Sequence, residues 1–170
     1  TIFARLIELI ATTKPDLSRL RYVTNAAAPM PVAHIEKLRT LLPHVDIFSM
    51  YGLTECTRAA YLEPKLIDAK PASVGKAMPN CEALVVTDAG EACATGEIGE
   101  LVIRGANVMR GYWRQPEETA RVLRPLGDSG GLVLHTGDLF RTDADGDLFF
   151  VGRVDDVFKC RGEKVSPKEV

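Results

Sequence analysis

The first 50 residues alternate between apolar patterns of helical and of strand type. Ile2 to Thr12 is apolar at helical spacing, which predicts an amphipathic helix. A short apolar run from Leu20 to Thr24 predicts a buried strand. Pro31 to Leu42 predicts a second helix with proline near its start, and Val45 to Met50 predicts the next strand. This strand–helix–strand order predicts a parallel α/β layer.

From Ser73 onward the pattern changes to short runs of β type with turn signals between them. Asp88-Ala89-Gly90 and Asp143-Ala144-Asp145-Gly146 are the clearest turns. Pro116 to Leu123 predicts one helix, whose first turn carries two glutamates where the helix dipole favours negative charge. The β-type runs are Ala83 to Thr87, Gly99 to Arg104, Leu132 to Thr136, Leu139 to Thr142 and Leu148 to Val151. They predict a small, mostly antiparallel β subdomain of meander or distorted-barrel type.

These patterns divide the chain into three parts and predict an α/β plus β fold class. Residues 1–72 form the end of a parallel α/β layer, and residues 73–153 form the β subdomain. Residues 154–170 start a small C-terminal α+β domain, because Ser166-Pro167-Lys168-Glu169 has the spacing of a helix-capping box. Since that helix is announced at the very end of the sequence, we expect a fragment of a longer protein.

Composition and charge indicate which classes of partner the protein is expected to lack. The formal net charge is −2 and no block of Lys or Arg occurs, so a nucleic-acid partner is not expected. No apolar run approaches the ~20 residues of a membrane span. The four cysteines lack Cys-x-x-Cys spacing, which favours reduced thiols and a cytoplasmic location over metal binding or disulfides. The three histidines are too scattered for a metal cluster.

Two short stretches after predicted strands could receive a ligand. Gly52 is expected to end the second strand, and Tyr51, Thr54 and Glu55 offer an aromatic face, a hydroxyl and a carboxylate. Ligands of open α/β sheets bind where strands end, so this place would suit a nucleotide with its metal. Small side chains at Ala27-Ala28-Pro29 would let a flat ligand approach the backbone. An ordinary strand exit and a tight turn are the alternatives.

Several stretches occur in an order typical of one family. They are Tyr51-Gly52-Leu53-Thr54-Glu55, Gly99-Glu100-Leu101-Val102-Ile103-Arg104-Gly105, Val108-Met109-Arg110-Gly111-Tyr112-Trp113, Thr136-Gly137-Asp138-Leu139, Gly152-Arg153-Val154-Asp155-Asp156 and Lys159-Cys160-Arg161-Gly162. The chain therefore resembles the adenylate-forming superfamily of acyl-CoA synthetases, aryl-CoA ligases, luciferases and peptide-synthetase adenylation domains. The resemblance covers most of the chain from about Leu20. Its specificity comes from the ordered series, since any single motif is common.

The resemblance implies a nucleotide site. Tyr51 would stack on adenine, Thr54 would hydrogen-bond the α-phosphate, and Glu55 would hold Mg²⁺. Asp138 would accept from both ribose hydroxyls, and Arg153 would bind ribose and phosphate oxygens. If so, the β subdomain must fold back over the end of the second strand. The alternatives are that Asp138 merely caps a turn and that Arg153 forms a surface ion pair with Asp155.

Other positions carry further implied roles. Phe150 and Gly52 would lie beside the nucleotide, and the turn Ala27-Ala28-Pro29 would face adenine and the acyl pocket. Asp155 matches a hinge about which the small C-terminal domain rotates between half-reactions. Lys159 matches a catalytic lysine of the thioester-forming orientation, with a solvated lysine as the alternative, and Gly162 matches a glycine beside the thiol tunnel. Tyr112 and Trp113 are expected in core packing.

The implied function is a two-step ligase that uses ATP, Mg²⁺ and coenzyme A. A carboxylic acid, fatty or aryl, would attack the α-phosphate of ATP, and coenzyme A would then displace AMP. One alternative is an adenylation domain that loads a carrier protein. Another is a catalytically inactive, nucleotide-binding relative. The family's phosphate-gripping loop and its C-terminal lysine are missing from this sequence, so we expect the isolated fragment to be inactive.

Overall fold

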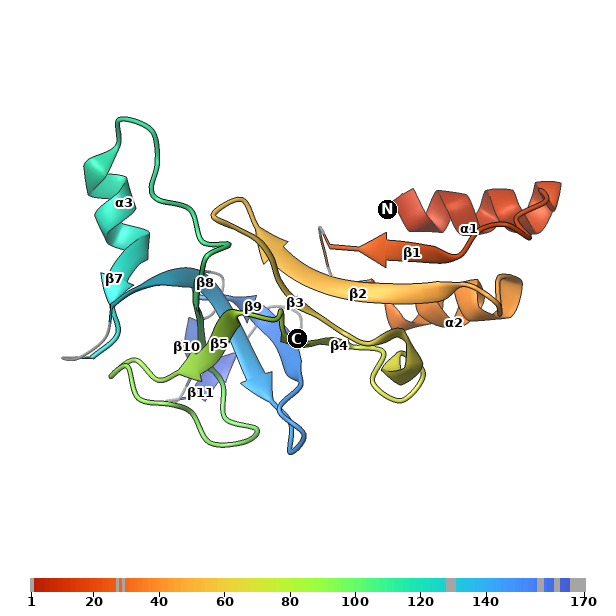
Figure 1. Ribbon diagram of the computed structural model, residues 1–170. Helices are drawn as coiled ribbons and strands as arrows, with labels where there is room; N and C mark the ends of the chain where they lie inside the picture. Colours follow the sequence, from red (N-terminus) through yellow and green to blue (C-terminus); the bar gives the residue numbers. More distant parts are fainter. Residues whose placement is uncertain are drawn as a thin grey trace.

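A mixed sheet of nine strands organises the part of the chain that the structure describes. The computed structural model describes residues 2–26, 28, 30–127 and 131–155, and the backbone of 158–160 and 163–165. The strands follow the path β1-β2-β3-β4-β9-β8-β6-β5, with β7 paired to β8. Figure 1 shows α1, β1 and α2 at one end of the molecule and α3 at the other. The path is open, so the strands described do not close into a barrel.

The N-terminal layer is parallel, as the sequence predicts. It contains α1 (Ile2–Thr13), β1 (Tyr22–Asn25), α2 (Val32–Leu41) and β2 (Asp46–Leu53). Strands β1 and β2 pair in parallel, with Tyr22 opposite Asp46 and Asn25 opposite Ser49. One apolar core joins both helices to this layer through the buried residues Ile7, Met30, Ile35, Leu38, Leu42, Val45, Ile47, Leu62 and Ile67. None of the helices among the described residues is long and apolar enough to cross a bilayer.

The remaining strands of the sheet pair antiparallel. They are β3 (Cys56–Tyr61), β4 (Ser73–Ala77), β5 (Cys81–Val86), β6 (Gly99–Gly105), β7 (Leu123–Pro125), β8 (Leu132–Thr142) and β9 (Leu148–Arg153). A short 3₁₀ turn, η1 (Pro64–Leu66), lies between β3 and β4, and α3 (Pro116–Val122) precedes β7. Strands β10 (Phe158–Cys160) and β11 (Glu163–Val165) form a separate antiparallel pair. The α/β plus β fold class is therefore confirmed, whereas the division at residues 72 and 153 stays a prediction.

Several local predictions were wrong. Gly52 does not end the second strand: β2 continues to Leu53 and turns through Thr54 and Glu55 into β3, a strand that the prediction missed. The pairing of β2 with β3 shifts between Tyr51 and Leu53, so Gly52 lies at an irregularity in the ladder. A Cβ atom at Gly52 would stand 2.7 Å from the backbone nitrogen of Arg58, and this close approach explains the glycine. The β4 strand was also missed, and the runs at 132–136 and 139–142 form one strand, β8.

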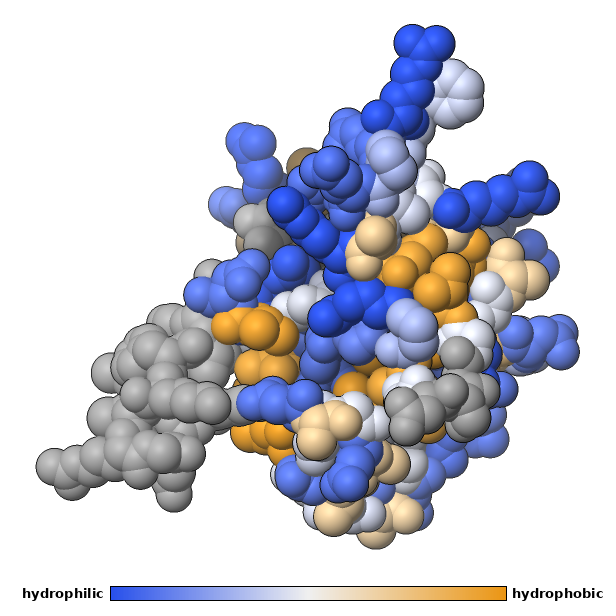
Figure 2. Space-filling view, turned by 90° about the vertical axis from the view of Figure 1, so that its left-hand side faces the viewer, coloured by the Kyte–Doolittle hydropathy of each residue, from blue (hydrophilic) through white to orange (hydrophobic). Residues whose placement is uncertain are grey.

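The end of the molecule at which α3 lies is mostly polar. Helix α3 buries none of its residues, and Figure 2 shows hydrophilic side chains around a group of hydrophobic ones on this face. Trp113, expected in core packing, is 83% exposed. The expectation of core packing was therefore wrong for Trp113.

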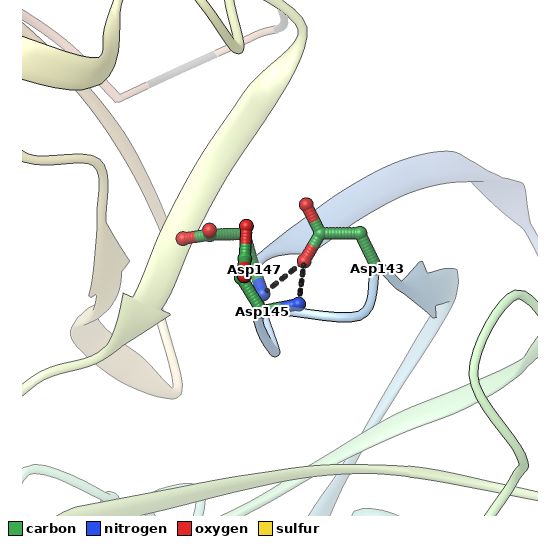
Figure 3. Close-up of side chains that lie close together, drawn as sticks. All are labelled: Asp143, Asp145 and Asp147. Atoms are coloured by element: carbon green, nitrogen blue, oxygen red, sulfur yellow. Dashed lines mark hydrogen bonds between the residues drawn. The ribbon is translucent and has the colours of Figure 1, made fainter.

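A cluster of three aspartates closes the far end of the β8–β9 hairpin. In Figure 3 the carboxylate of Asp143 accepts hydrogen bonds from the backbone N–H groups of Asp145 and Asp147, at 3.0 and 2.9 Å. Lys70, from the connection before β4, donates to all three carboxylates at 2.5–2.7 Å. Asp147 is only 2% exposed. The lysine therefore supplies the positive charge that this acidic turn needs, and it ties β4 to the hairpin.

Replacing Lys70 by Met should lower the thermal midpoint, because three carboxylates would then face one another without a cation. Burial alone would raise the pKa of Asp143, but the bonds from Lys70 and the backbone outweigh it and the pKa is lowered. The pKa of Lys70 is raised by its bonds to Asp143, Asp145 and Asp147, so Lys70 stays charged at acid and neutral pH.

A carboxylate whose pKa is lower in the folded than in the unfolded state stabilises the fold at pH values above its unfolded-state pKa. This contribution is lost as the pH falls through the folded-state pKa. The difference in midpoint between wild type and Lys70→Met should therefore shrink from about pH 6 to about pH 3. Scanning calorimetry at both pH values measures it. The exposed Lys76 on β4 provides the control, Lys76→Met, which should change little. A difference that is independent of pH would contradict the interpretation.

Candidate functional site

A pocket of about 290 Å³ lies where β1, β2, β4, β8 and β9 meet. Its size is near the lower end of the range for small-molecule sites. The lining residues come from segments far apart in the sequence: Asn25, Ala26, Ala28, Ser49, Met50, Tyr51, Gly52, Leu53, Val74, Asp138, Phe150 and Arg153. The structure thus brings together six of the residues singled out in the sequence, namely Ala28, Tyr51, Gly52, Asp138, Phe150 and Arg153.

The pocket lining contains one buried carboxylate, that of Asp138. Asp138 is 6% exposed and binds one donor at each oxygen. The Tyr51 hydroxyl donates to Oδ2 at 2.5 Å, and Nη1 of Arg153 donates to Oδ1 at 2.8 Å. The alternative that Arg153 pairs with Asp155 is therefore not what the structure shows: its partner is Asp138, and Asp155 is exposed beyond the end of β9. Both donors hold the carboxylate at the pocket surface.

Tyr51 stays a donor in this arrangement. Burial raises the pKa of Tyr51, and the hydrogen bond to the Asp138 carboxylate raises the pKa further. The phenol therefore keeps its hydrogen at neutral pH. Its ring stands edge-on to Phe140, with centroids 4.9 Å apart, and Phe140 stands edge-on to Phe150 at 5.5 Å. The aromatic side of the pocket is thus fixed by the core beneath it.

The Thr136-Gly137-Asp138 motif forms a bulge in β8. Glu100 of β6 pairs with Leu139 and Val102 pairs with His135, so a single residue, Leu101, faces three residues of β8. Gly137 adopts φ +68°, a conformation that glycine tolerates best. Such a bulge re-aims a side chain, and here it places Asp138 in the pocket wall.

Thr54 and Glu55 lie in the adjoining hairpin turn between β2 and β3, outside the pocket lining. The Tyr112 hydroxyl donates to Oε1 of Glu55 at 2.5 Å, and the backbone N–H of Met109 donates to the Glu55 carbonyl at 2.8 Å. The pKa of Tyr112 is raised to about 12, mainly by the hydrogen bond to Glu55 and secondly by burial. Tyr112 was expected only in core packing, so this contact with Glu55 is a role that the sequence did not predict.

The hairpin turn fits a divalent metal ion chemically. Tyr112 fixes one oxygen of Glu55, while the other has no hydrogen-bond partner in the described part of the chain. Mg²⁺ prefers oxygen ligands and is usually held by one or two carboxylates together with substrate phosphates. The other oxygen of Glu55 and the exposed hydroxyl of Thr54 are groups of that kind. Among the described residues, the one group of three possible metal ligands is Asp143, Asp145 and Asp147, all of which already bind the Lys70 ammonium.

The remaining predicted site residues fall partly outside the described residues. Ala27, Pro29 and Gly162 lie outside them, as does the side chain of Lys159, whose backbone is part of β10. Ala28 lines the pocket, and Asn25 donates to its carbonyl at 2.7 Å. The roles assigned to these positions stay predictions.

Some lining residues were not predicted. Val74 lies on β4, which showed no alternating pattern because it is short and contains Gly75 at φ +74°. Gly75 itself was the available signal: a Cβ there would stand 1.9 Å from the Tyr61 carbonyl oxygen, so a close backbone approach requires glycine. Glu100 was interpreted as part of a structural strand, although its carboxylate contacts the Asp138 bulge.

The open sheet places an aromatic ring, a buried aspartate and an arginine around one pocket, which is the grouping that the sequence resemblance implies for a nucleotide site. A family model described as "AMP-binding enzyme" matches residues 1–113. The chain belongs to this family of AMP-binding enzymes, the adenylate-forming superfamily.

Individual relatives agree with the family. Acyl-CoA synthetase 7 of Caenorhabditis elegans is 34% identical over 169 residues, which are 99% of this chain and 30% of that protein. The probable nonribosomal peptide synthetase CymA of Salinispora arenicola (strain CNS-205) is 40% identical over 137 residues, 79% of this chain and 2% of that protein. The chain thus spans less than a third of the nematode relative's length.

A solved structure agrees with the fold. The O-succinylbenzoate coenzyme A synthetase MenE of Bacillus subtilis, solved in complex with ATP and magnesium ion, superposes with a TM-score of 0.83 at 30% identity. The match covers 99% of this chain and 33% of that one. The described strands and helices therefore correspond to about a third of that synthetase.

Removing the Tyr51 hydroxyl should destabilise the fold, because the buried Asp138 carboxylate loses one of its two donors. We expect Tyr51→Phe to lower the free energy of unfolding by about 1–3 kcal/mol, measured by urea denaturation. Tyr22→Phe is the matched control, since Tyr22 is 53% exposed and should change stability by less than about 0.5 kcal/mol. Equal losses in the two variants would contradict a special role for the Tyr51–Asp138 bond.

Proposed function

We propose that the protein containing this chain is an ATP-dependent ligase that joins a carboxylic acid, fatty or aryl, to coenzyme A. The acid would first be adenylated with release of pyrophosphate, and the thiol of coenzyme A would then displace AMP. The single observation that carries the proposal is the meeting of Tyr51, Asp138 and Arg153 around one pocket, at the positions where the resemblance puts adenine, ribose and phosphate.

The chemistry of these groups suits a nucleotide. An ionised carboxylate only accepts hydrogen bonds, so Asp138 can accept one from each of the two ribose hydroxyls. These bonds would replace those from Tyr51 and Arg153 or form beside them. Arg153 is 49% exposed at its side chain and can turn part of its guanidinium to phosphate oxygens. Phe150 and Tyr51 supply aromatic surface beside the base. Each residue would thus bind one chemical part of ATP.

Adenylation places negative charge on the α-phosphate, and its catalysis depends on positioning and electrostatic stabilisation. Glu55 and the phosphates of ATP would hold Mg²⁺, which neutralises this charge when bound. Thr54, one residue earlier in the same turn, offers a hydroxyl donor to a phosphate oxygen. Tyr112 orients the Glu55 carboxylate through its hydroxyl.

Coenzyme A is the proposed acceptor because the nematode relative and the B. subtilis neighbour are both named coenzyme A synthetases. The peptide-synthetase relative favours a second candidate, an adenylation unit that loads a carrier protein. An inactive nucleotide-binding relative is the third hypothesis. These three hypotheses differ in whether AMP is released and in which thioester is then formed.

The decisive experiment uses the full-length protein with ATP, magnesium and a panel of short, long and aromatic acids. We expect AMP release that depends on the acid, and a thioester when coenzyme A is supplied. Thioester formation only with a phosphopantetheinyl carrier would support the second candidate instead. No AMP release with any acid, despite ATP binding, would support the inactive relative.

Asp138→Ala should weaken ATP binding by at least about tenfold, the loss expected when a hydrogen bond to a charged group is removed. Isothermal titration of the full-length protein with ATP measures the affinity. Asp145→Ala is the control, because Asp145 is an exposed acid at the opposite end of the same hairpin. Equal affinities in wild type and Asp138→Ala would contradict the assigned ribose site.

Asp155 would serve as the hinge between the two half-reactions. It is exposed, and it follows Val154, whose N–H donates to the Gly137 carbonyl at 2.8 Å. Asp155→Pro should mainly slow one half-reaction, because proline fixes φ and restricts backbone rotation. Pyrophosphate exchange and thioester formation are measured separately on the full-length protein. Equal losses in both steps would count against the hinge.

A further inference from the structure

Both carboxylate oxygens of Glu100 contact residues of β8, the strand that carries Asp138. Its Oε1 accepts from the backbone N–H of Gly137 at 3.0 Å, and its Oε2 lies 2.9 Å from Nδ1 of His135. An ionised carboxylate only accepts, so Nδ1 of His135 carries the hydrogen. Glu100 lies on β6, outside the pocket lining, and its side chain is only 23% exposed. The carboxylate therefore acts on the pocket through the backbone of β8.

The bulge explains why Gly137 needs a partner from a side chain. Where three residues of β8 face Leu101 alone, the regular ladder cannot pair every backbone group. Thr136 fills part of the gap: its hydroxyl donates to the Leu101 carbonyl at 2.7 Å and accepts from the Asp138 N–H at 3.1 Å. The Gly137 carbonyl accepts from Val154. Glu100 supplies the acceptor for the Gly137 N–H.

His135 holds Glu100 in this position. Its side chain is only 13% exposed, so the contact between the imidazole and the carboxylate is largely shielded from water. Arg124, from β7, lies 3.9 Å from the same Oε2 atom and is half exposed. The two oxygens of Glu100 therefore have different partners, since His135 anchors Oε2 while Oε1 accepts from the bulge.

We propose that Glu100 and His135 form a positioning pair that holds the Thr136–Asp138 bulge in the shape that aims Asp138 at the ribose of the nucleotide. The proposal rests on the nucleotide site of the proposed function and adds to it two residues that do not touch the ligand. Loss of the pair would let the bulge relax, so the Asp138 carboxylate would leave its position between Tyr51 and Arg153. Binding of the ribose hydroxyls would weaken most.

The test compares AMP with 2′-deoxy-AMP by isothermal titration of the full-length protein. Wild type should prefer AMP, and Asp138→Ala, which leaves no acceptor, should remove that preference. Glu100→Ala should weaken AMP binding by about tenfold, the size expected when a partly buried N–H loses its acceptor, while 2′-deoxy-AMP, which keeps one of the two hydroxyls that Asp138 would accept, should be weakened by only about threefold. Glu100→Gln keeps an acceptor oxygen and should bind both within about threefold of wild type.

Glu82→Ala is the matched control. Glu82 lies on the neighbouring strand β5, opposite Arg104, and its side chain is 60% exposed. It should leave both affinities unchanged. If Glu100→Ala does not fold, His135→Phe takes its place, because it keeps a buried ring and removes the anchor of Glu100. It should reproduce the selective loss of AMP binding.

The outcomes separate the two proposals. Equal weakening of AMP and 2′-deoxy-AMP, or no weakening, in Glu100→Ala and His135→Phe overturns the positioning pair. A wild-type protein that prefers AMP through Asp138 would then still support the nucleotide site. A wild-type protein that binds neither nucleotide overturns both.

Discussion

The buried carboxylate of Asp138 is the constraint on which the pocket depends. A charge that is taken out of water is costly unless it is paired and hydrogen-bonded. Asp138 meets this requirement with Tyr51, 87 residues away in the sequence, and Arg153, 15 residues away. The three groups come from β2, β8 and β9, so satisfying one charge fixes the relative positions of three strands. Nearby, Val74 of β4 completes the wall.

The β8–β9 hairpin is held by charge at both of its ends. Asp138 and Arg153 pair across the hairpin at the pocket, and Lys70 pairs with the aspartate turn at the opposite end. Between them lies an apolar stretch in which Leu139, Phe140 and Leu148 are buried. A site built on such a hairpin needs little reorganisation when a ligand arrives, since supporting contacts fix its side chains. The bulge at Gly137 departs from regular pairing at the site, and the β8–β9 ladder itself shifts register between Leu139 and Phe140.

The sequence predicted the parallel α/β layer and half of the pocket lining, and it failed where structure depends on contacts between distant backbones. Helical spacing was sufficient for α1 and α2, because a single apolar core covers one face of each. Gly52 was wrongly predicted to end a strand, since nothing local shows that β3 returns so close that a Cβ atom at Gly52 would stand 2.7 Å from the Arg58 nitrogen. The ordered motifs indicated that Asp138 and Arg153 belong to one site. No periodicity could predict that Tyr51 donates to Asp138, or that Glu100 completes the bulge.

The two sides of the proposed nucleotide site are supported differently. Asp138 is fixed by a buried network and by the aromatic core beneath Tyr51. Glu55 is fixed by Tyr112, whose backbone N–H donates to Thr119 of α3 at 2.9 Å. That segment buries little: α3 has no buried residue and Trp113 is almost fully exposed. Regions with few buried contacts open at lower free energy than the core. In the proposed nucleotide site the groups around Asp138 would therefore be preformed, whereas the Glu55 carboxylate, beside the proposed phosphate position, could adjust its position when a ligand binds.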